Sequence, residues 1–186
     1  MLASKSPRRQ QILSDSGIPF ALRSVDVPEQ RRSGESPADY VRRLAQEKAF
    51  AVAMFEGEII LGADTVVVVD DQVLEKPSDA RDATRMLELL SGREHEVITG
   101  ICLRSDASTI VDLATTRVRF VRLTLEEIVA YVASGEPMDK AGAYAIQGLA
   151  SKFIDRIEGS YSNVVGLPVA LVYRYWREIS GQTATT

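Results

Sequence analysis

The chain has few of the residues that build a disulfide framework or a zinc site. Its 186 residues contain one cysteine, Cys102, and one histidine, His95. A single thiol forms no intrachain disulfide, and a Cys/His zinc site needs more ligands than this chain offers. We therefore expect a reducing compartment, the cytoplasm. His95 lies between a helix end and a strand, where we expect a surface residue.

Long apolar runs are also absent. No apolar run approaches 18 residues and no secretory signal opens the chain, so the sequence predicts neither a membrane span nor export. The net charge of −4 argues against a general nucleic-acid binder but is compatible with a local basic pocket for a phosphate. The length and the 45% hydrophobic composition suit one large domain or two small lobes with an ample core.

Lysine is scarce as well, with five lysines against seventeen arginines. Four of the five lysines (Lys5, Lys48, Lys76 and Lys140) lie in the short motifs described below, which suggests positive charges placed for a purpose. With so little histidine and cysteine, any catalysis should depend on carboxylates, lysines, arginines and a metal that prefers oxygen ligands, such as Mg²⁺ or Mn²⁺.

Asp64 is the most conspicuous acidic residue because it interrupts an apolar stretch, residues 59–69, rich in Ile and Val. That composition predicts a buried strand. A lone carboxylate there costs several kcal/mol unless it is paired or binds a metal. Gly62, just before it, permits a bulge or a close backbone approach. Asp64 is then either a fixed acid, base or metal ligand, or a strand-end aspartate that caps a turn.

Basic residues cluster at the first predicted helix. Ser4 or Ser6 can cap this helix, and Pro7 suits its first turn. Lys5, Arg8 and Arg9 lie close to the free amide groups of that turn, a place that attracts anions. The cluster is interpreted as a phosphate cradle or, alternatively, as a solvated basic turn.

Lys48 lies on the apolar side of a predicted helix that is capped at Ser36 and runs to about Phe55. An inward lysine needs a partner, which Asp64 or a bound phosphate would supply. Otherwise its side chain extends outward to solvent.

The remaining elements follow from apolar periodicity and turn residues. We expect strands at 18–27, 72–75, 94–104, 109–122 and 153–157, helices from Ser78 to Ser91, from Thr124 to Ala133 and after Pro168, a loop at 28–35, a turn-rich segment at 136–148 and a frayed tail at 182–186. Residues 1–186 are expected to form a single domain of two lobes.

Seven stretches, in order along the chain, resemble one family, the Maf-like nucleoside triphosphate pyrophosphatases. They are Leu2-Ala3-Ser4-Lys5-Ser6-Pro7-Arg8-Arg9, Leu44-Ala45-Gln46-Glu47-Lys48-Ala49, Gly62-Ala63-Asp64-Thr65-Val66-Val67, Glu75-Lys76-Pro77, Asp139-Lys140-Ala141-Gly142-Ala143-Tyr144, Ile146-Gln147-Gly148, and Gly159-Ser160-Tyr161 with Val165-Gly166-Leu167-Pro168. Any one of these stretches would be a weak signal, but the seven together, spread along nearly the whole chain, make the match specific.

The resemblance implies an α/β fold, an elongated mixed twisted sheet flanked by helices, with two lobes around a central cleft, similar to the inosine triphosphate pyrophosphatases. It implies an enzyme that splits a nucleoside triphosphate into monophosphate and pyrophosphate with a divalent metal, Mg²⁺ or Mn²⁺. The forms of two motifs, Gly62–Thr65 and Ile146–Gly148, resemble the branch that acts on dTTP and UTP rather than on 7-methyl-GTP. By family analogy we also expect a homodimer.

The resemblance also implies roles for single residues. Asp64 matches the catalytic base. Ser6, Arg9, Glu29, Lys48, Lys76 and Gln147 match residues that line the site, and Arg8, Thr65 and Gln147 match residues that bear on base choice. Glu29 would complete a metal site with Asp64, and Lys48, Lys76 and Arg9 would hold phosphate oxygens. The rival functions are a nucleotide-binding regulator of cell division without turnover and a general phosphatase that releases orthophosphate.

Overall fold

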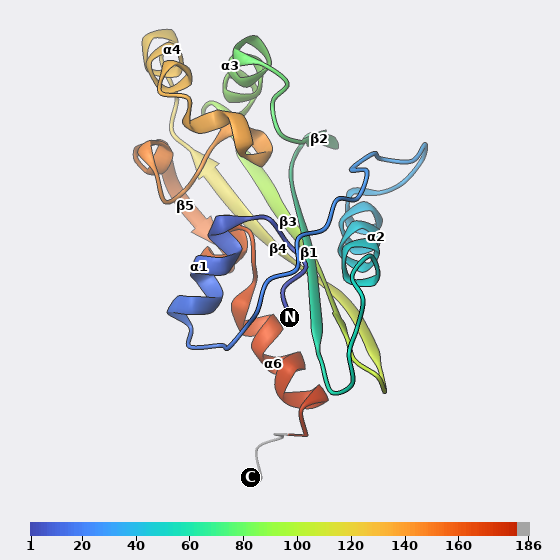
Figure 1. The fold of residues 1–186 in the computed structure, drawn as a ribbon. Helices are drawn as coiled ribbons and strands as arrows, with labels where there is room; N and C mark the ends of the chain where they lie inside the picture. The colour runs from blue at the N-terminus through green and yellow to red at the C-terminus, as the bar shows by residue number, and fades with distance from the viewer. Residues whose placement is uncertain (182–186) are drawn as a thin grey trace. The chain divides into compact units, whose positions relative to one another are not determined.

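The computed structural model describes residues 1–181, which form a mixed α/β fold (Figure 1). Its helices are α1 (Pro7–Asp15), α2 (Pro37–Phe50), α3 (Ala80–Leu90), α4 (Leu125–Ala133), α5 (Tyr161–Val165) and α6 (Val169–Ile179), with 3₁₀ turns η1 (Glu136–Asp139), η2 (Ala141–Ala143) and η3 (Leu149–Phe153). Its strands are β1 (Ile60–Val69), β2 (Gln72–Leu74), β3 (Glu94–Arg104), β4 (Thr109–Phe120) and β5 (Ile154–Glu158).

The five strands form one sheet in the order β2-β1-β3-β4-β5. The pairs β1–β2 and β4–β5 are antiparallel, and isolated parallel bridges join Leu2 to Leu22 and to Leu61. The chain divides into two compact units. Among the described residues, the first comprises 1–64, 99–114 and 166–181, and the second comprises 65–98 and 115–165. Three strands, β1, β3 and β4, contribute residues to both units.

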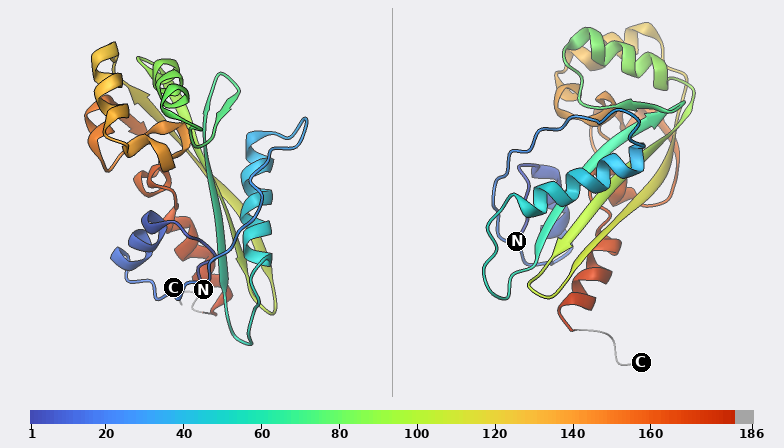
Figure 2. Two further views of the ribbon diagram at one scale, coloured as in Figure 1. Left: turned by 45° about the horizontal axis from the view of Figure 1, so that its top comes forward. Right: turned by 90° about the vertical axis from the view of Figure 1, so that its right-hand side faces the viewer.

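In the first unit, α2 packs closely on the sheet, and Figure 2 shows it beside β1 in both views. A Cβ added at Gly62 would lie 2.1 Å from the Ala45 carbonyl oxygen, and one at Gly100 would lie 2.3 Å from the Val41 carbonyl oxygen. No side chain fits at these two positions, so glycine lets the helix backbone approach the strands. Of the two roles that the sequence allows for Gly62, the structure shows the close approach.

The second unit has an apolar core that α3 and α4 cover side by side (Figure 1). The aromatic rings of Phe120, Tyr144 and Phe153 lie within this core. The Phe120 and Tyr144 rings meet edge to face, with centroids 4.8 Å apart. Helix α4 begins at the predicted capping box, in which Thr124 and Glu127 each accept a hydrogen bond from the other's backbone N–H.

Several predicted boundaries are wrong. Residues 18–27 form no strand and contribute only the bridge at Leu22, because the segment pairs with Leu2 alone rather than with a full neighbouring strand. Helix α2 ends at Phe50, five residues before the predicted end. The cap of α3 is Asp79 rather than Ser78, because the Asp79 carboxylate accepts the Asp82 N–H. The short helix α5 was not predicted.

The prediction for His95 is also wrong. Its side chain is only 3% exposed, and its Nε2 lies 2.8 Å from the Tyr144 hydroxyl oxygen. The ring also meets Phe120 edge to face, at a centroid distance of 5.1 Å. Strand alternation explains the error, since Glu94 and Glu96 on either side are exposed and His95 therefore points to the opposite face.

Other expectations stay predictions. Neither the single domain over residues 1–186 nor the likeness to inosine triphosphate pyrophosphatases is tested by the fold. The tail at 182–186 lies outside the described residues. Among residues 1–181, no helix combines the length and the apolar character that a membrane crossing requires.

The burial of His95 predicts a specific loss of stability in acid. Burial lowers the pKa of His95 from 6.5 to about 4, so the unfolded chain binds this proton first as the pH falls. The free energy of unfolding should therefore decrease by about 3 kcal/mol between pH 6.5 and pH 4 through this group alone. Denaturant unfolding of the parent and of His95→Gln across that range measures the difference in slope. If the free energy of unfolding falls equally with pH in both proteins, protonation of His95 does not contribute to the loss of stability.

Candidate functional site

Lys48, Asp64 and Glu29 form an ionic cluster in the first unit. The Lys48 Nζ donates to Asp64 Oδ1 at 2.5 Å and to Glu29 Oε1 at 2.6 Å. Lys48 and Asp64 are 8% and 7% exposed, whereas Glu29 is an exposed residue. Asp64 therefore has a charged partner, as the sequence required, and Lys48 is directed inward rather than to solvent.

The position of the lysine follows from the pattern of α2. The buried side chains of this helix are Tyr40, Val41, Leu44, Ala45, Lys48 and Ala49. This spacing places the Lys48 side chain on the helix face that packs against the sheet. The glycine contact at Gly62 brings the strand that carries Asp64 close to that face. Helix packing therefore puts the ammonium beside the carboxylate.

The protonation of Asp64 is set by opposing effects. Burial raises its pKa above the ordinary aspartate value, and the positive charges of Lys48 and Arg9 act in the opposite direction. A carboxylate with a raised pKa accepts a proton more readily than a solvated one. The neighbouring cations favour the ionised form that a base requires.

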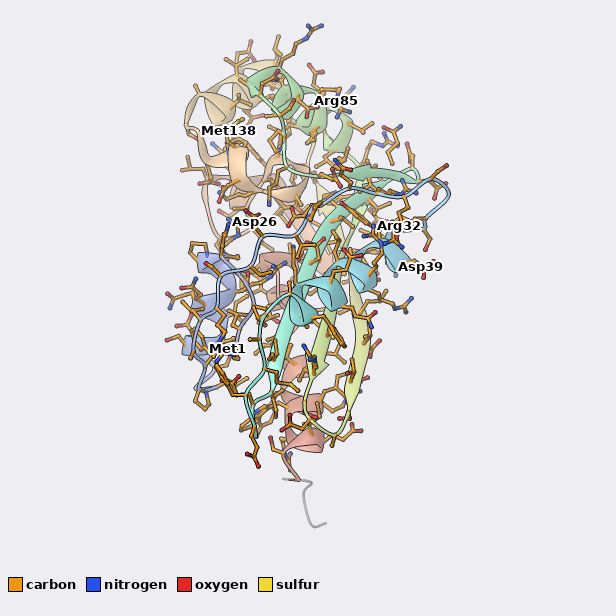
Figure 3. The ribbon with its side chains drawn as sticks, turned by 45° about the vertical axis from the view of Figure 1, so that its right-hand side comes forward. Met1, Asp26, Arg32, Asp39, Arg85 and Met138 are labelled. Atoms are coloured by element: carbon orange, nitrogen blue, oxygen red, sulfur yellow. The ribbon has the colours of Figure 1, made fainter. Side chains whose placement is uncertain are left out.

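Glu29 belongs to an irregular loop that Arg43 holds against α2. The Arg43 guanidinium donates to the Gln30 carbonyl at 3.0 Å and to the Glu35 carboxylate at 2.6 and 2.8 Å. The hydrogen bonds from Arg43 to the Glu35 carboxylate lower the pKa of Glu35 to about 2. Figure 3 labels Arg32, from the same loop, near the N-terminal end of α2. Because the Gln30 carbonyl is fixed, the backbone beside Glu29 is fixed as well.

Arg9 is buried and ties three segments together. Its Nε donates to the Gly166 carbonyl at 2.8 Å and its Nη1 to the Ala63 carbonyl at 2.9 Å. Burial lowers the pKa of this guanidinium, and the charges of Asp64 and Glu29 oppose that effect. Arg9 thus places positive charge near the carboxylates while two of its donors serve the backbone.

The rest of the predicted phosphate cradle lies around the start of α1. Ser6 is the N-cap, and its hydroxyl accepts the Arg9 N–H. Lys5 makes an exposed ion pair with Asp26, with 3.3 Å between Nζ and Oδ2. Arg8 is half-buried. The structure confirms the helix start and the cap, and phosphate binding there stays a prediction.

Thr65, Lys76 and Gln147 belong to the second unit. Thr65 is half-buried on β1, whereas Lys76 and Gln147 are exposed in connecting segments. The segment before Lys76 is fixed by a hydrogen bond from the Gly142 N–H to the Glu75 carbonyl at 3.1 Å.

Two hydrogen bonds of the Glu136 carboxylate next to the Gln147 segment were missed. The Tyr131 hydroxyl donates to Glu136 Oε1 at 2.8 Å, and Glu136 Oε2 accepts the Leu149 N–H at 3.1 Å. The only signal in the sequence was an acid at the start of a small, turn-rich segment. That signal does not reveal which backbone groups the carboxylate binds.

The two carboxylates of the ionic cluster are suitable ligands for a divalent metal. The nearest oxygens of Asp64 and Glu29 already converge on one cation, the Lys48 ammonium, at 2.5 and 2.6 Å. Within residues 1–181 no group of three or more Asp, Glu, His or Cys side chains is arranged to hold a metal. Two carboxylates with water and phosphate oxygens are a usual environment for Mg²⁺.

The fold and these side chains define a mixed α/β protein with a buried carboxylate–lysine centre. A family model described as Maf-like protein matches residues 1–179, and the chain belongs to this family. Similar curated proteins named dTTP/UTP pyrophosphatase come from Koribacter versatilis (51% identity, covering 95% of this chain and 92% of the relative) and Anaeromyxobacter dehalogenans strain 2CP-C (52%, covering 91% and 88%). A third, from Geobacter sulfurreducens, is 50% identical and covers 96% and 95%.

The buried ion pair predicts a large stability effect for Lys48. Lys48→Met should lower the free energy of unfolding in metal-free buffer by about 3 kcal/mol, because it leaves a buried carboxylate without its cation. Denaturant unfolding measures the change. Lys5→Met, which removes an exposed pair, is the matched control and should cost under about 1 kcal/mol.

A second substitution separates the ion pair from packing. Lys48→Met combined with Asp64→Asn should recover part of the lost stability, since no buried charge is then unpaired. If the double variant is less stable than Lys48→Met alone, loss of the charge partner is not the cause.

Proposed function

We propose that this protein hydrolyses dTTP and UTP to the nucleoside monophosphate and pyrophosphate. The names of its relatives supply the substrates, and these relatives align with nearly the whole length of this chain. The structural observation that carries the proposal is the Lys48 ammonium that joins Asp64 to Glu29. That cluster unites a proton acceptor, a positive charge and a pair of oxygen ligands.

The reaction requires a water directed at the α phosphorus, neutralisation of phosphate charge and a stabilised pyrophosphate leaving group. We assign the base to Asp64, which accepts the proton of the attacking water. Its burial raises its pKa, and the positive charges of Lys48 and Arg9 oppose that effect and favour its ionised form. The bond between the α phosphorus and the oxygen that bridges to the β phosphate breaks as the water oxygen bonds to the α phosphorus.

The cations are proposed to hold the phosphates. Lys48 exchanges a carboxylate partner for a phosphate oxygen, and Lys76 contributes a second ammonium. Arg9 and Ser6, at the start of α1, bind phosphate oxygens in the same proposal. Arg8, Thr65 and Gln147 are assigned to recognition of the base, whose carbonyl acceptors and N3–H donor match an amide or a hydroxyl.

A divalent metal, Mg²⁺ or Mn²⁺, is part of the proposal, with Asp64 and Glu29 as its protein ligands. When bound, it neutralises phosphate charge and lowers the pKa of a coordinated water. The homodimer and the cytoplasmic location stay predictions.

A nucleotide panel tests the function. With Mg²⁺ or Mn²⁺, dTTP and UTP should be turned over faster than ATP, GTP or 7-methyl-GTP, and the product should be pyrophosphate. A chelator should abolish the activity, and added metal should restore it. Both pyrophosphate and orthophosphate are measured. Orthophosphate as the first product would indicate a general phosphatase. Nucleotide binding without turnover would indicate a nucleotide-binding regulator. Faster hydrolysis of 7-methyl-GTP would place the protein in the other branch of the family.

Asp64→Asn tests the catalytic base. The variant should fold and lose about 10²-fold or more in turnover of UTP at saturating metal, the usual scale for a positioned general base. Asp26→Asn is the control, because Asp26 is an exposed aspartate with a lysine partner and should leave turnover unchanged. Near-native turnover in Asp64→Asn would remove this carboxylate from the chemistry.

A further inference from the structure

The segment that carries Gln147 is held at both ends by one carboxylate–hydroxyl pair. Glu136, on η1 where Figure 3 labels Met138, accepts the Leu149 N–H through Oε2 at 3.1 Å. Its other oxygen, Oε1, accepts the Tyr131 hydroxyl at 2.8 Å, and that hydroxyl accepts the Ala145 N–H at 3.3 Å. The two backbone amides lie two residues before and two residues after Gln147.

The pair is itself firmly placed. Tyr131 is 3% exposed on α4, and burial together with its bond to Glu136 raises the pKa of the phenol, so the hydroxyl stays a donor. The Lys140 ammonium binds the Glu136 carbonyl at 2.7 Å and fixes the backbone that carries the carboxylate. Both carboxylate oxygens of Glu136 therefore have defined partners.

Gly148 completes the arrangement. A Cβ at this position would lie 2.3 Å from Glu136 Oε1 and 2.4 Å from Oε2, so only glycine permits the carboxylate to approach the turn this closely. The turn is also closed by a bond from the Gly148 N–H to the Ala145 carbonyl at 3.1 Å. Between these fixed points the Gln147 side chain is exposed.

We infer that Glu136 and Tyr131 are positioning residues for base selection, which act by fixing the Gln147 amide and do not touch the nucleotide. This inference rests on the proposed function, because it gives the Glu136–Tyr131 pair, called the clamp below, a role in discriminating pyrimidine from purine triphosphates. An amide discriminates between bases only when its donor and acceptor are held in register with theirs, since a mismatched base then leaves polar groups unpaired. A mobile turn lets the amide adapt to either base.

The test measures kcat/KM for UTP and for GTP, and the ratio of the two is the readout. Glu136→Ala should reduce this ratio by about tenfold, to the level of Gln147→Ala, because both variants abolish one discriminating contact. The double variant should show no further loss of the ratio, since the two residues act as one unit. Glu136→Gln keeps one acceptor oxygen for the Leu149 N–H but replaces the acceptor of the Tyr131 hydroxyl with an amide donor, so it should rescue part of the ratio.

A milder variant and a matched control accompany the test. Tyr131→Phe removes only the hydroxyl and should also lower the ratio, which covers the case in which Glu136→Ala fails to fold. Tyr175→Phe removes a comparable hydroxyl, which donates to Asp112 at 2.5 Å in the first unit, and should leave the ratio unchanged. Equal losses for UTP and GTP in Glu136→Ala and Tyr131→Phe would indicate a purely structural role and overturn the inference.

Amide hydrogen exchange separates failure of the clamp from failure of the proposed function. In Glu136→Ala the amides of Ala145 and Leu149 should exchange at least about tenfold faster than in the parent, because their acceptors are lost or released. Unchanged exchange overturns the clamp whatever the activity. A parent without UTP turnover overturns the proposed function and with it the selective role, even where exchange confirms that the clamp exists.

Discussion

The buried contact between Lys48 and Asp64 is the constraint on which the rest of the first unit depends. A carboxylate between two apolar runs is stable only with a cation beside it, and the cation is carried by a helix. The helix reaches the strand because Gly62 has no side chain to separate them. The close packing of α2 on β1 and the pairing of the buried Asp64 carboxylate with Lys48 therefore depend on each other.

Arginine and lysine have different tasks in this unit. Arg9 and Arg43 use their forked guanidinium groups to bind backbone carbonyls and carboxylates, which ties β1 and Gly166 to α1 and the loop before α2 to α2. Lys48 instead presents a compact charge to two carboxylates. A planar group with five donors suits the first task, and a point charge that can exchange partners suits the second.

Buried polar groups in the second unit fix the segments that follow α4. The Tyr144 hydroxyl meets His95 inside an aromatic core, and the Tyr131 hydroxyl meets Glu136 at the edge of that core. Each contact joins a regular element to the turn-rich stretch from η1 to η3. A stretch with so little regular structure gains its definition from hydrogen bonds to such elements, since an unpaired buried polar group is costly.

The sequence by itself determined the class of fold, the family, most helices and strands, and the need of a buried Asp64 for a partner. That Lys48 is this partner was one of several outcomes it allowed, and the structure decided it. The features that the sequence determined depend on local periodicity, capping residues and the cost of an isolated buried charge, all of which are legible along the chain. Only the tertiary structure decided that His95 is buried, that residues 18–27 form no strand, and that Glu136 binds both sides of the Gln147 turn. The reason is physical. Each of these outcomes depends on which residues a segment contacts in the folded chain, and those residues are distant in sequence or are brought close by the backbone geometry.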